Sequence, residues 1–259
     1  MADRRQAFNE ITGAYSSARP GYPEALWDAL RAALAPLAVP HLAADVGSGT
    51  GISTRQLATA LEDWQVIGIE PGDDMFQQAL RDSEGSGIDF RQGDAEALPL
   101  DASAVGLVLA AQAVQWFDRP AFYREARRVL ALGGLLGIIQ NNRAWERSPF
   151  LDAYETFLEA HSPAYSRHYR SFDVAQELTD AGFGGVVVHR ANWMRTSSHA
   201  LFLEMSRSST KMKAAVSAIG EREAVSLVEG LLEQHHPGGE LDVPYTSELY
   251  LGASPGAVT

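Results

Sequence analysis

The residues with the clearest chemical potential are three alternating glycines that follow a short apolar run. The chain reads D-V-G-S-G-T-G, with Asp45 two positions before Gly47, and with Gly49 and Gly51 behind it. An apolar strand, a glycine turn and a helix that begins at Ile52 form the corner at which open α/β sheets bind nucleotides. Glycines adopt positive φ angles and carry no Cβ, so a ligand can lie directly against their N–H groups. We therefore expect a ligand-binding loop here.

The spacing of these glycines argues against a dinucleotide. A dinucleotide loop follows G-x-G-x-x-G, and its third glycine would stand where this chain has Ile52. A second apolar strand, from Trp64, ends in Glu70, which lies 70 − 47 = 23 positions after Gly47. An acidic residue about 20 positions after the loop accepts the ribose hydroxyls in nucleotide-binding α/β folds. A nucleotide-dependent oxidoreductase is therefore the weaker of two enzyme hypotheses.

Two further segments repeat the arrangement of a strand that ends in a polar loop. A strand from Ile88 leads into G-D-A-E-A-L-P, which contains Asp94, and the apolar run from Val105 leads to Gln112. In this order the segments resemble class I S-adenosylmethionine (SAM)-dependent methyltransferases of the small-molecule type, a group similar to the trans-aconitate and ubiquinone-biosynthesis methyltransferases. The resemblance covers roughly residues 8–141.

The resemblance implies a Rossmann-like, doubly wound α/β fold with a seven-stranded sheet, its last strand antiparallel, and a helical substrate-cover insertion. It implies SAM as the cofactor and S-adenosylhomocysteine (SAH) as the product. In this family the aspartate of the G-D-A segment, here Asp94, receives the adenine amino group. The cofactor-binding residues that the glycine loop and the resemblance indicate are Tyr15, Arg19, Asp45, Gly47, Ser48, Gly49, Thr50, Glu70, Pro71, Met75, Asp94, Ala95 and Gln112.

The segment before the first strand reads Y-S-S-A-R-P from Tyr15 and is similar to the lid of small-molecule methyltransferases. The resemblance brings Tyr15 and Arg19 to the methionine end of SAM, where the planar guanidinium of Arg19 suits a carboxylate. Tyr15 is also a candidate catalytic group. We expect residues 8–20 to close over the cofactor when it binds. The alternative is that Tyr15 packs against a helix and Arg19 is solvated.

Aromatic side chains near the strand ends and in the segment 142–172 are expected to enclose the methyl acceptor. The candidate substrate-binding residues are Trp116, Phe117, Phe150, Tyr154, Tyr165 and Tyr169. Apolar residues at helical spacing from Pro149 equally fit the buried face of a packed helix. His161 and His168 are the candidate catalytic bases, although Pro163 argues against one helix that carries both.

Basic side chains also gather in or near this segment, namely Arg143, Arg147, Arg167, Arg170 and Arg195. Surface positions are the simpler interpretation, but convergence of two of them would indicate an acceptor with a carboxylate or phosphate. Enzymes that methylate exocyclic or amide nitrogens carry an Asn/Asp-Pro-Pro-aromatic motif after the fourth strand, where this chain has A-A-Q-A-V-Q-W-F. Methylation of DNA bases or of glutamine is therefore disfavoured.

Capping residues and apolar periodicity predict the remaining elements. Asp118 is expected to cap a helix that runs to Leu132 and ends at Gly133. The other expected helices span 24–34, 173–181, 199–207 and 211–234, and the later strands span 135–140, 183–190 and 245–251.

The length and composition fit one globular domain over residues 1–259, and the resemblance implies that it is a methyltransferase domain. Its expected parts are an N-terminal lid and helix (8–36), a SAM-binding core (41–141), the substrate-cover insertion (142–172) and a C-terminal half with further cover helices (173–259). The net charge of 21 − 33 = −12 disfavours nucleic-acid and membrane partners. The chain has no cysteine, and no local cluster of residues predicts a metal site.

The resemblance implies a small-molecule partner. A cytoplasmic location and a monomer or homodimer are further expectations. The identity of the acceptor stays open, as do the accepting atom (carbon, nitrogen or oxygen) and the use of a general base. A protein that binds SAM without catalysis is the non-enzyme alternative.

Overall fold

The computed structural model describes residues 20–163 and 165–255. The predicted lid residues Tyr15 and Arg19 lie outside the described residues, so the expected closure of the lid stays a prediction. Within the described ranges, no helix combines the length and the apolar character needed to cross a membrane.

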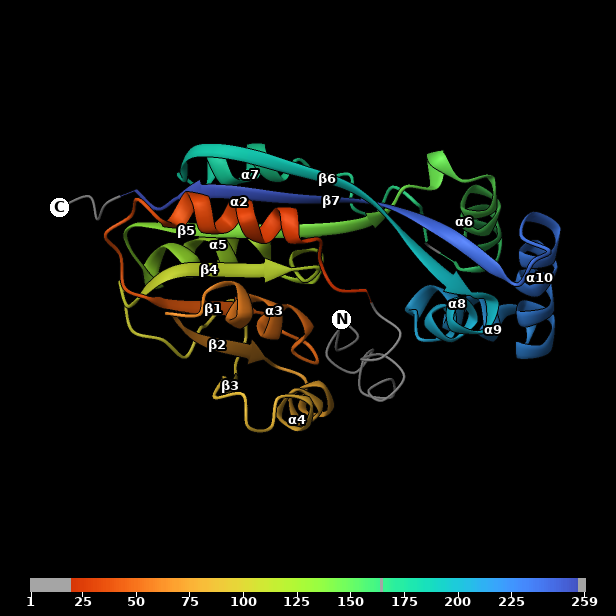
Figure 1. The fold of residues 1–259 in the computed structure, drawn as a ribbon, viewed down its shortest axis with the longest axis horizontal. Coiled ribbons are helices and arrows are strands. Elements are labelled where there is room, and N and C mark those ends of the chain that lie inside the picture. Colours follow the sequence, from red (N-terminus) through yellow and green to blue (C-terminus); the bar gives the residue numbers. More distant parts are fainter. Residues whose placement is uncertain (1–19, 164, 256–259) are drawn as a thin grey trace.

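Seven strands of the described chain form one sheet in the order β3-β2-β1-β4-β5-β7-β6 (Figure 1). Strands β1 to β5 pair in parallel, whereas β7 runs antiparallel to both of its neighbours. The predicted Rossmann-like sheet with an antiparallel last strand is confirmed. The strands span Leu42–Val46 (β1), Gln65–Glu70 (β2), Asp89–Gln92 (β3), Val105–Ala111 (β4), Leu130–Arg143 (β5), Gly184–Ser198 (β6) and Glu240–Ala253 (β7).

Helices cover both faces of this sheet because the side chains of a strand alternate between its faces. In β4, Leu107 and Leu109 pack in one core with α2 and α3, whereas Val108 and Ala110 pack in another with α5 and α7. All four residues are fully buried, as expected for a parallel strand covered on both sides. The helices of this part span Glu24–Leu34 (α2), Ile52–Ala60 (α3), Asp73–Asp82 (α4), Arg119–Val129 (α5) and Val174–Asp180 (α7).

Helix α5 begins at its predicted cap but ends earlier than expected. The Asp118 carboxylate accepts a hydrogen bond from the N–H of Ala121 at 3.1 Å. The helix ends at Val129 and β5 follows directly, so the predicted helical end at Leu132 is wrong. Gly133, with a φ of 75°, lies inside β5, where the pairing with β4 shifts register. This glycine therefore accommodates a strand irregularity and does not end a helix.

The helix predicted over 211–234 is in fact two helices. Gly220, with a φ of 88° and a ψ of 149°, separates α9 (Thr210–Ile219) from α10 (Glu221–His235). A residue in this conformation cannot continue a right-handed helix. The preceding helix α8 (His199–Arg207) has the predicted bounds.

Strands β6 and β7 form a long ribbon that reaches beyond the parallel sheet. Their pairing continues to Ser198 opposite Glu240, so the strands predicted over 183–190 and 245–251 were too short. Figure 1 shows α6 (Pro149–His161), α8, α9 and α10 at the far end of this ribbon. These four helices, which we call the cover, pack around a hydrophobic core of their own.

Candidate active site

The glycine loop after β1 has one side closed by packing and one side open. All three of its glycines have positive φ. A Cβ on Gly47 would meet the Cβ of Ala113 at 2.6 Å and the ring of Phe117 at 3.0 Å, so only glycine fits there. A Cβ on Gly49 would meet no atom of the described residues within 4 Å. The open side of the loop therefore lies at Gly49.

Glu70 stands at the end of β2, beside this loop. One oxygen of its carboxylate accepts the N–H of Gly49 at 2.9 Å, and the other accepts the N–H of Gly72 at 2.9 Å. Burial raises the pKa of Glu70, and these two N–H donors oppose that shift. A carboxylate offers about four lone-pair sites, so each oxygen can accept a further hydroxyl. This geometry fits the predicted contact with a ribose.

Asp45 is fully buried beneath the loop. Its Oδ2 accepts the hydroxyl of Ser53 at 2.6 Å and that of Thr54 at 2.7 Å, both from the first turn of α3. Burial raises the pKa of Asp45 to about 6. Asp45, predicted to bind the cofactor, thus joins β1 to α3 in the described structure and orients the loop from behind.

The other predicted cofactor residues follow the carboxyl ends of neighbouring strands. The register of β2 and β3 places Glu70 opposite Gln92, so Asp94 follows at the same edge of the sheet. Pro71 is exposed directly after Glu70. Met75 and Ala95 are buried beside this edge, with 3% and 5% of their surface exposed.

Gln112 follows β4 in a conformation that is rare for a residue with a side chain. Its φ is 55°, and its side-chain amide donates to the backbone oxygen of Asn141. Its Oε1 is buried and has no hydrogen-bond partner in the described structure. Such backbone strain clusters at ligand sites. The Ser48 and Thr50 hydroxyls of the glycine loop are also buried without a partner there. These three oxygens fit a site built to hydrogen-bond a bound molecule.

A cavity extends from the glycine loop to the cover, and we call it the cover cavity. Among the described residues it is lined by Pro20, Tyr22, Gly47, Ser48, Gly49, Thr50, Ile52, Ser53, Ala111, Gln112, Asn141, Arg143, Tyr154, Tyr169, Arg170, Met205, Ser206, Ser209, Lys211 and Tyr245. It brings together the open side of the loop, the strained Gln112 and polar side chains of the cover.

Two of the six predicted acceptor-binding aromatics, Tyr154 and Tyr169, line the cover cavity. Phe150 is instead packed inside the cover, with its ring 5.0 Å from that of Phe202. The hydroxyl of Tyr165 donates to Glu155 at 2.5 Å, outside the lining.

The remaining two lie near the end of β4. Trp116 is 36% exposed, and Phe117 packs beneath the glycine loop and against Phe122 at 4.9 Å. An acceptor-binding role for these aromatic side chains stays a prediction, and periodicity could not separate the cavity side of α6 from its packed side.

The predicted bases do not line the cover cavity in the described structure. α6 ends at His161, whose ring packs 5.2 Å from that of Phe157. His168 lies exposed in the following turn, 5.9 Å from Trp145. Burial raises the pKa of the cavity residue Tyr154, so its phenol stays protonated at neutral pH. No cluster of metal-binding side chains occurs in the described ranges.

Two of the five flagged arginines converge on the cover cavity, namely Arg143 and Arg170. Arg167 pairs instead with Asp152 and Glu159 at the surface of the cover. Lys211, which the sequence reasoning missed, adds a third cation to the lining. No local signal marks Lys211, because only the folding of α9 onto the cavity brings it there.

Residues 44–138 match a family model described as a methyltransferase domain. The chain is 35% identical over 142 residues to an uncharacterized methyltransferase of Mycobacterium bovis, with 54% of each chain covered. It is 32% identical over 129 residues to a protein of Dictyostelium discoideum named as a methyltransferase, over 50% of this chain and 46% of that one. The chain thus spans about half the length of these curated relatives.

Solved structures extend the likeness to the whole fold. One from Anaeromyxobacter dehalogenans, described as a type II methyltransferase, has a TM-score of 0.68 at 22% identity, covering 92% of this chain and 97% of that one. A phosphoethanolamine N-methyltransferase of Haemonchus contortus, bound to phosphomonomethylethanolamine and SAH, has a TM-score of 0.53 at 17% identity, covering 97% and 57%. At such identities the likeness establishes the fold.

The family match, the sheet topology and the glycine loop with Glu70 together define the class. Residues 44–138 of this chain are thus a methyltransferase domain, and the resemblance to class I SAM-dependent enzymes, with SAM as the cofactor, fits the sheet topology and the contact of Glu70 with the glycine loop. The narrower resemblance to the trans-aconitate group stays a prediction.

Proposed function

We propose that the whole chain transfers a methyl group from SAM to a small-molecule acceptor held in the cover cavity. The observation that carries this proposal is the continuity of the cavity. The same lining includes Gly49 at the open side of the cofactor loop, Tyr169 of the segment after α6, and Lys211 of the cover helix α9. An acceptor bound under the cover would therefore lie next to the cofactor loop.

Each part of the site has a distinct task in this proposal. Glu70 accepts the ribose hydroxyls, and Asp94 receives the adenine at the next strand end. Ser48 and Thr50 supply hydroxyls that lack other partners within the described residues. When bound, SAM supplies a methyl group on a cationic sulfur. An acceptor atom attacks the methyl carbon, and the electron pair of the carbon–sulfur bond stays on sulfur as SAH leaves. The cover excludes water and fixes the approach of the acceptor, which gives a large part of the rate.

A small molecule is a better acceptor than a nucleic acid for this chain. The net charge of −12 repels a polyanion, and the cover lies beyond the ends of β2 and β4 to which their arrowheads point (Figure 1). The non-catalytic alternative would retain the loop and Glu70 but show no turnover. A nucleotide-dependent oxidoreductase would need a loop for a pyrophosphate, which Ile52 in place of a third glycine disfavours.

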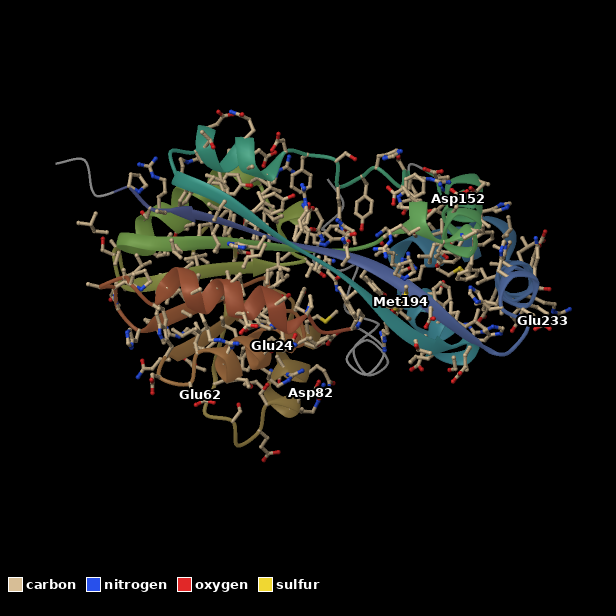
Figure 2. The ribbon with its side chains drawn as sticks, turned by 45° about the horizontal axis from the view of Figure 1, so that its top comes forward. Glu24, Glu62, Asp82, Asp152, Met194 and Glu233 are labelled. Atoms are coloured by element: carbon tan, nitrogen blue, oxygen red, sulfur yellow. The ribbon has the colours of Figure 1, made fainter. Side chains whose placement is uncertain are left out.

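Replacing Glu70 with alanine is expected to weaken SAH binding. Two ribose hydroxyls and the N–H groups of Gly49 and Gly72 lose their acceptor, which costs about 1–3 kcal/mol, or roughly 5- to 150-fold in Kd. Isothermal titration with SAH measures this change. Glu62→Ala removes the same charge from an exposed turn (Figure 2) and is the matched control. Equal SAH affinity in both variants would contradict the role assigned to Glu70.

Turnover itself is tested by incubating the chain with SAM and a panel of small-molecule acceptors. Release of SAH, together with a product heavier by one methylene group, is the expected result for at least one acceptor. The Gly49→Val variant should release no SAH in the same assay. SAH binding without turnover on a broad panel of acids, amines and phenols would favour the non-catalytic alternative.

A further inference from the structure

Three cations from separate parts of the chain meet in the cover cavity. Arg143 ends β5, Arg170 lies in the turns between α6 and α7, and Lys211 lies in the first turn of α9. Among the described residues that line this cavity there is no aspartate or glutamate. The contrast with the whole chain is sharp, because acidic residues outnumber Lys and Arg by 33 to 21.

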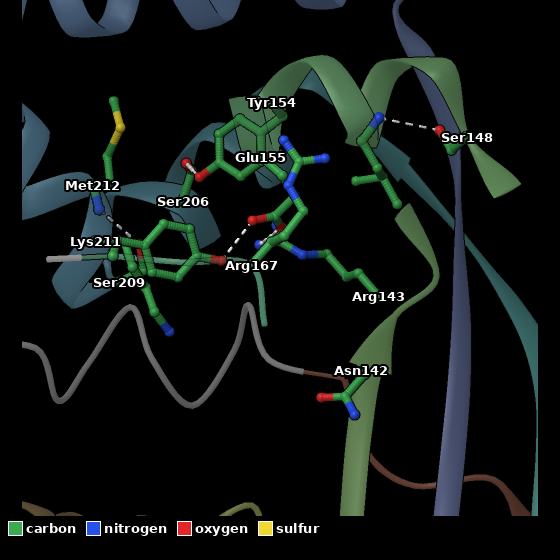
Figure 3. A network of polar contacts seen from close by, with 12 residues as sticks. Asn142, Arg143, Ser148, Tyr154, Glu155, Arg167, Ser206, Ser209, Lys211 and Met212 are labelled. Carbon is green, nitrogen blue, oxygen red and sulfur yellow. Dashed lines mark hydrogen bonds and ion pairs between the residues drawn. The ribbon is translucent and has the colours of Figure 1, made fainter. Parts of the chain in front are cut away.

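Arg143 is held rigidly at one side of the cavity. Its guanidinium pairs with Glu155 at 3.1 Å and lies 5.0 Å from the ring centre of Tyr154. Burial alone would lower the pKa of Arg143, but the charge of Glu155 raises it, so the guanidinium stays protonated. Figure 3 shows Arg143 and Glu155 next to Tyr154, whose hydroxyl bonds to that of Ser206. The buried carboxylate thus stabilises a cation at the lining.

Arg170 and Lys211 meet at a single aromatic ring. The Nζ of Lys211 lies 2.9 Å from the Tyr169 hydroxyl and 4.1 Å from its ring centre, and the guanidinium of Arg170 lies 4.8 Å from the same ring. Arg170 also donates to the side-chain oxygen of Asn142 at 2.7 Å. Tyr169 therefore holds two positively charged side chains at the cavity.

The chemistry of the lining also restricts the atom that receives the methyl group. The described lining contains no histidine, aspartate or glutamate, and burial raises the pKa of the Tyr154 phenol, which stays protonated at neutral pH. An amine or phenol acceptor must lose a proton, whereas a carboxylate is already ionised at neutral pH. A carboxylate oxygen can attack the methyl carbon with its lone pair, forming an ester as the carbon–sulfur pair stays on sulfur. No proton has to move in that step.

We infer that the acceptor is an anionic small molecule whose carboxylate or phosphate group binds Arg143, Arg170 and Lys211 in the cover cavity. The inference rests on the proposed function of the same site. Guanidinium and ammonium groups make short, charge-assisted hydrogen bonds to both kinds of oxyanion. The hydroxyls of Ser206 and Ser209 in the lining add neutral donors.

Direct binding tests this inference without turnover. Succinate and glycerol phosphate are titrated into the full chain, with succinamide and glycerol as neutral counterparts, in the presence and absence of SAH. We expect one or both anions to bind and their neutral counterparts not to bind. Binding of succinate alone assigns a carboxylate, and binding of glycerol phosphate alone assigns a phosphate. Failure of both anions to bind, or equal binding of anion and neutral counterpart, would overturn the inference.

Charge-removing variants then locate the binding. Lys211→Gln and Arg170→Gln should each weaken anion binding at least about tenfold, while Arg222→Gln, on the exposed surface of α10, should leave it unchanged. Arg143 is left in place because its removal would leave the buried Glu155 carboxylate without its ion-pair partner. Equal weakening by Arg222→Gln, or none by Lys211→Gln and Arg170→Gln, would contradict the assigned site. SAH affinity, measured in the same titrations, tests the proposed function separately.

Discussion

Gly49→Val is expected to abolish SAM binding while the chain stays folded. The φ of Gly49 is 57°, and no atom of the described residues lies within 4 Å of the position its Cβ would take, so a valine side chain would project into the region where the ligand is expected. A branched residue at positive φ is also strained, at a cost of about 1–3 kcal/mol. Isothermal titration with SAH should therefore give no measurable heat, and thermal unfolding should show a cooperative transition at a lower temperature.

Gly85→Val is the matched control for that experiment. Gly85 has a φ of 78° and equally open surroundings, but it lies in the turn between α4 and β3 and not in the cover cavity. It should reproduce the strain of Gly49→Val and retain full SAH affinity. If both variants bind SAH as the unchanged chain does, the glycine loop is not the cofactor site.

The second large effect concerns stability and pH at Asp45. Its pKa is raised from 3.8 to about 6 by burial, so the folded chain holds this proton more tightly than the unfolded chain. The protonated Asp45 carboxyl therefore contributes to the free energy of unfolding. This contribution is complete below about pH 4 and is lost as the pH rises through about 6. A pKa difference of about two units between the folded and the unfolded chain corresponds to roughly 3 kcal/mol in the free energy of unfolding.

Asp45→Asn should remove this dependence, because asparagine keeps an oxygen for Ser53 and Thr54 but has no proton to lose. Urea unfolding of both proteins between about pH 4 and pH 7 measures the free energy of unfolding. As the pH rises, the free energy of unfolding of Asp45→Asn should increase relative to that of the unchanged chain. A constant difference across this range would show that Asp45 titrates as an ordinary carboxylate.

Features that depend on neighbouring residues could be predicted from the sequence. The D-V-G-S-G-T-G loop, Glu70 at the end of the next strand and the Asp118 cap each combine a local turn with an adjacent element, and the structure has each in its predicted place. The resemblance also implied a seven-stranded sheet with an antiparallel last strand, and the structure has both.

Features that depend on tertiary packing could not be predicted from the sequence. Gly133 and Gly220 are the same residue type, yet one accommodates a strand irregularity and the other divides two helices. Phe150 and Tyr154 share the apolar side of α6, but only the contacts of the cover decide which of them faces the cavity. Lys211 comes to the site through a helix whose position no local pattern encodes.

The central claim is that this chain binds SAM at the glycine loop as a methyltransferase, and one titration tests it most directly. SAH and NADH are titrated separately into the unchanged full chain. The account predicts saturable binding of one SAH per chain and no heat from NADH. Saturable binding of NADH, with SAH giving no heat, would contradict the account and restore the oxidoreductase hypothesis.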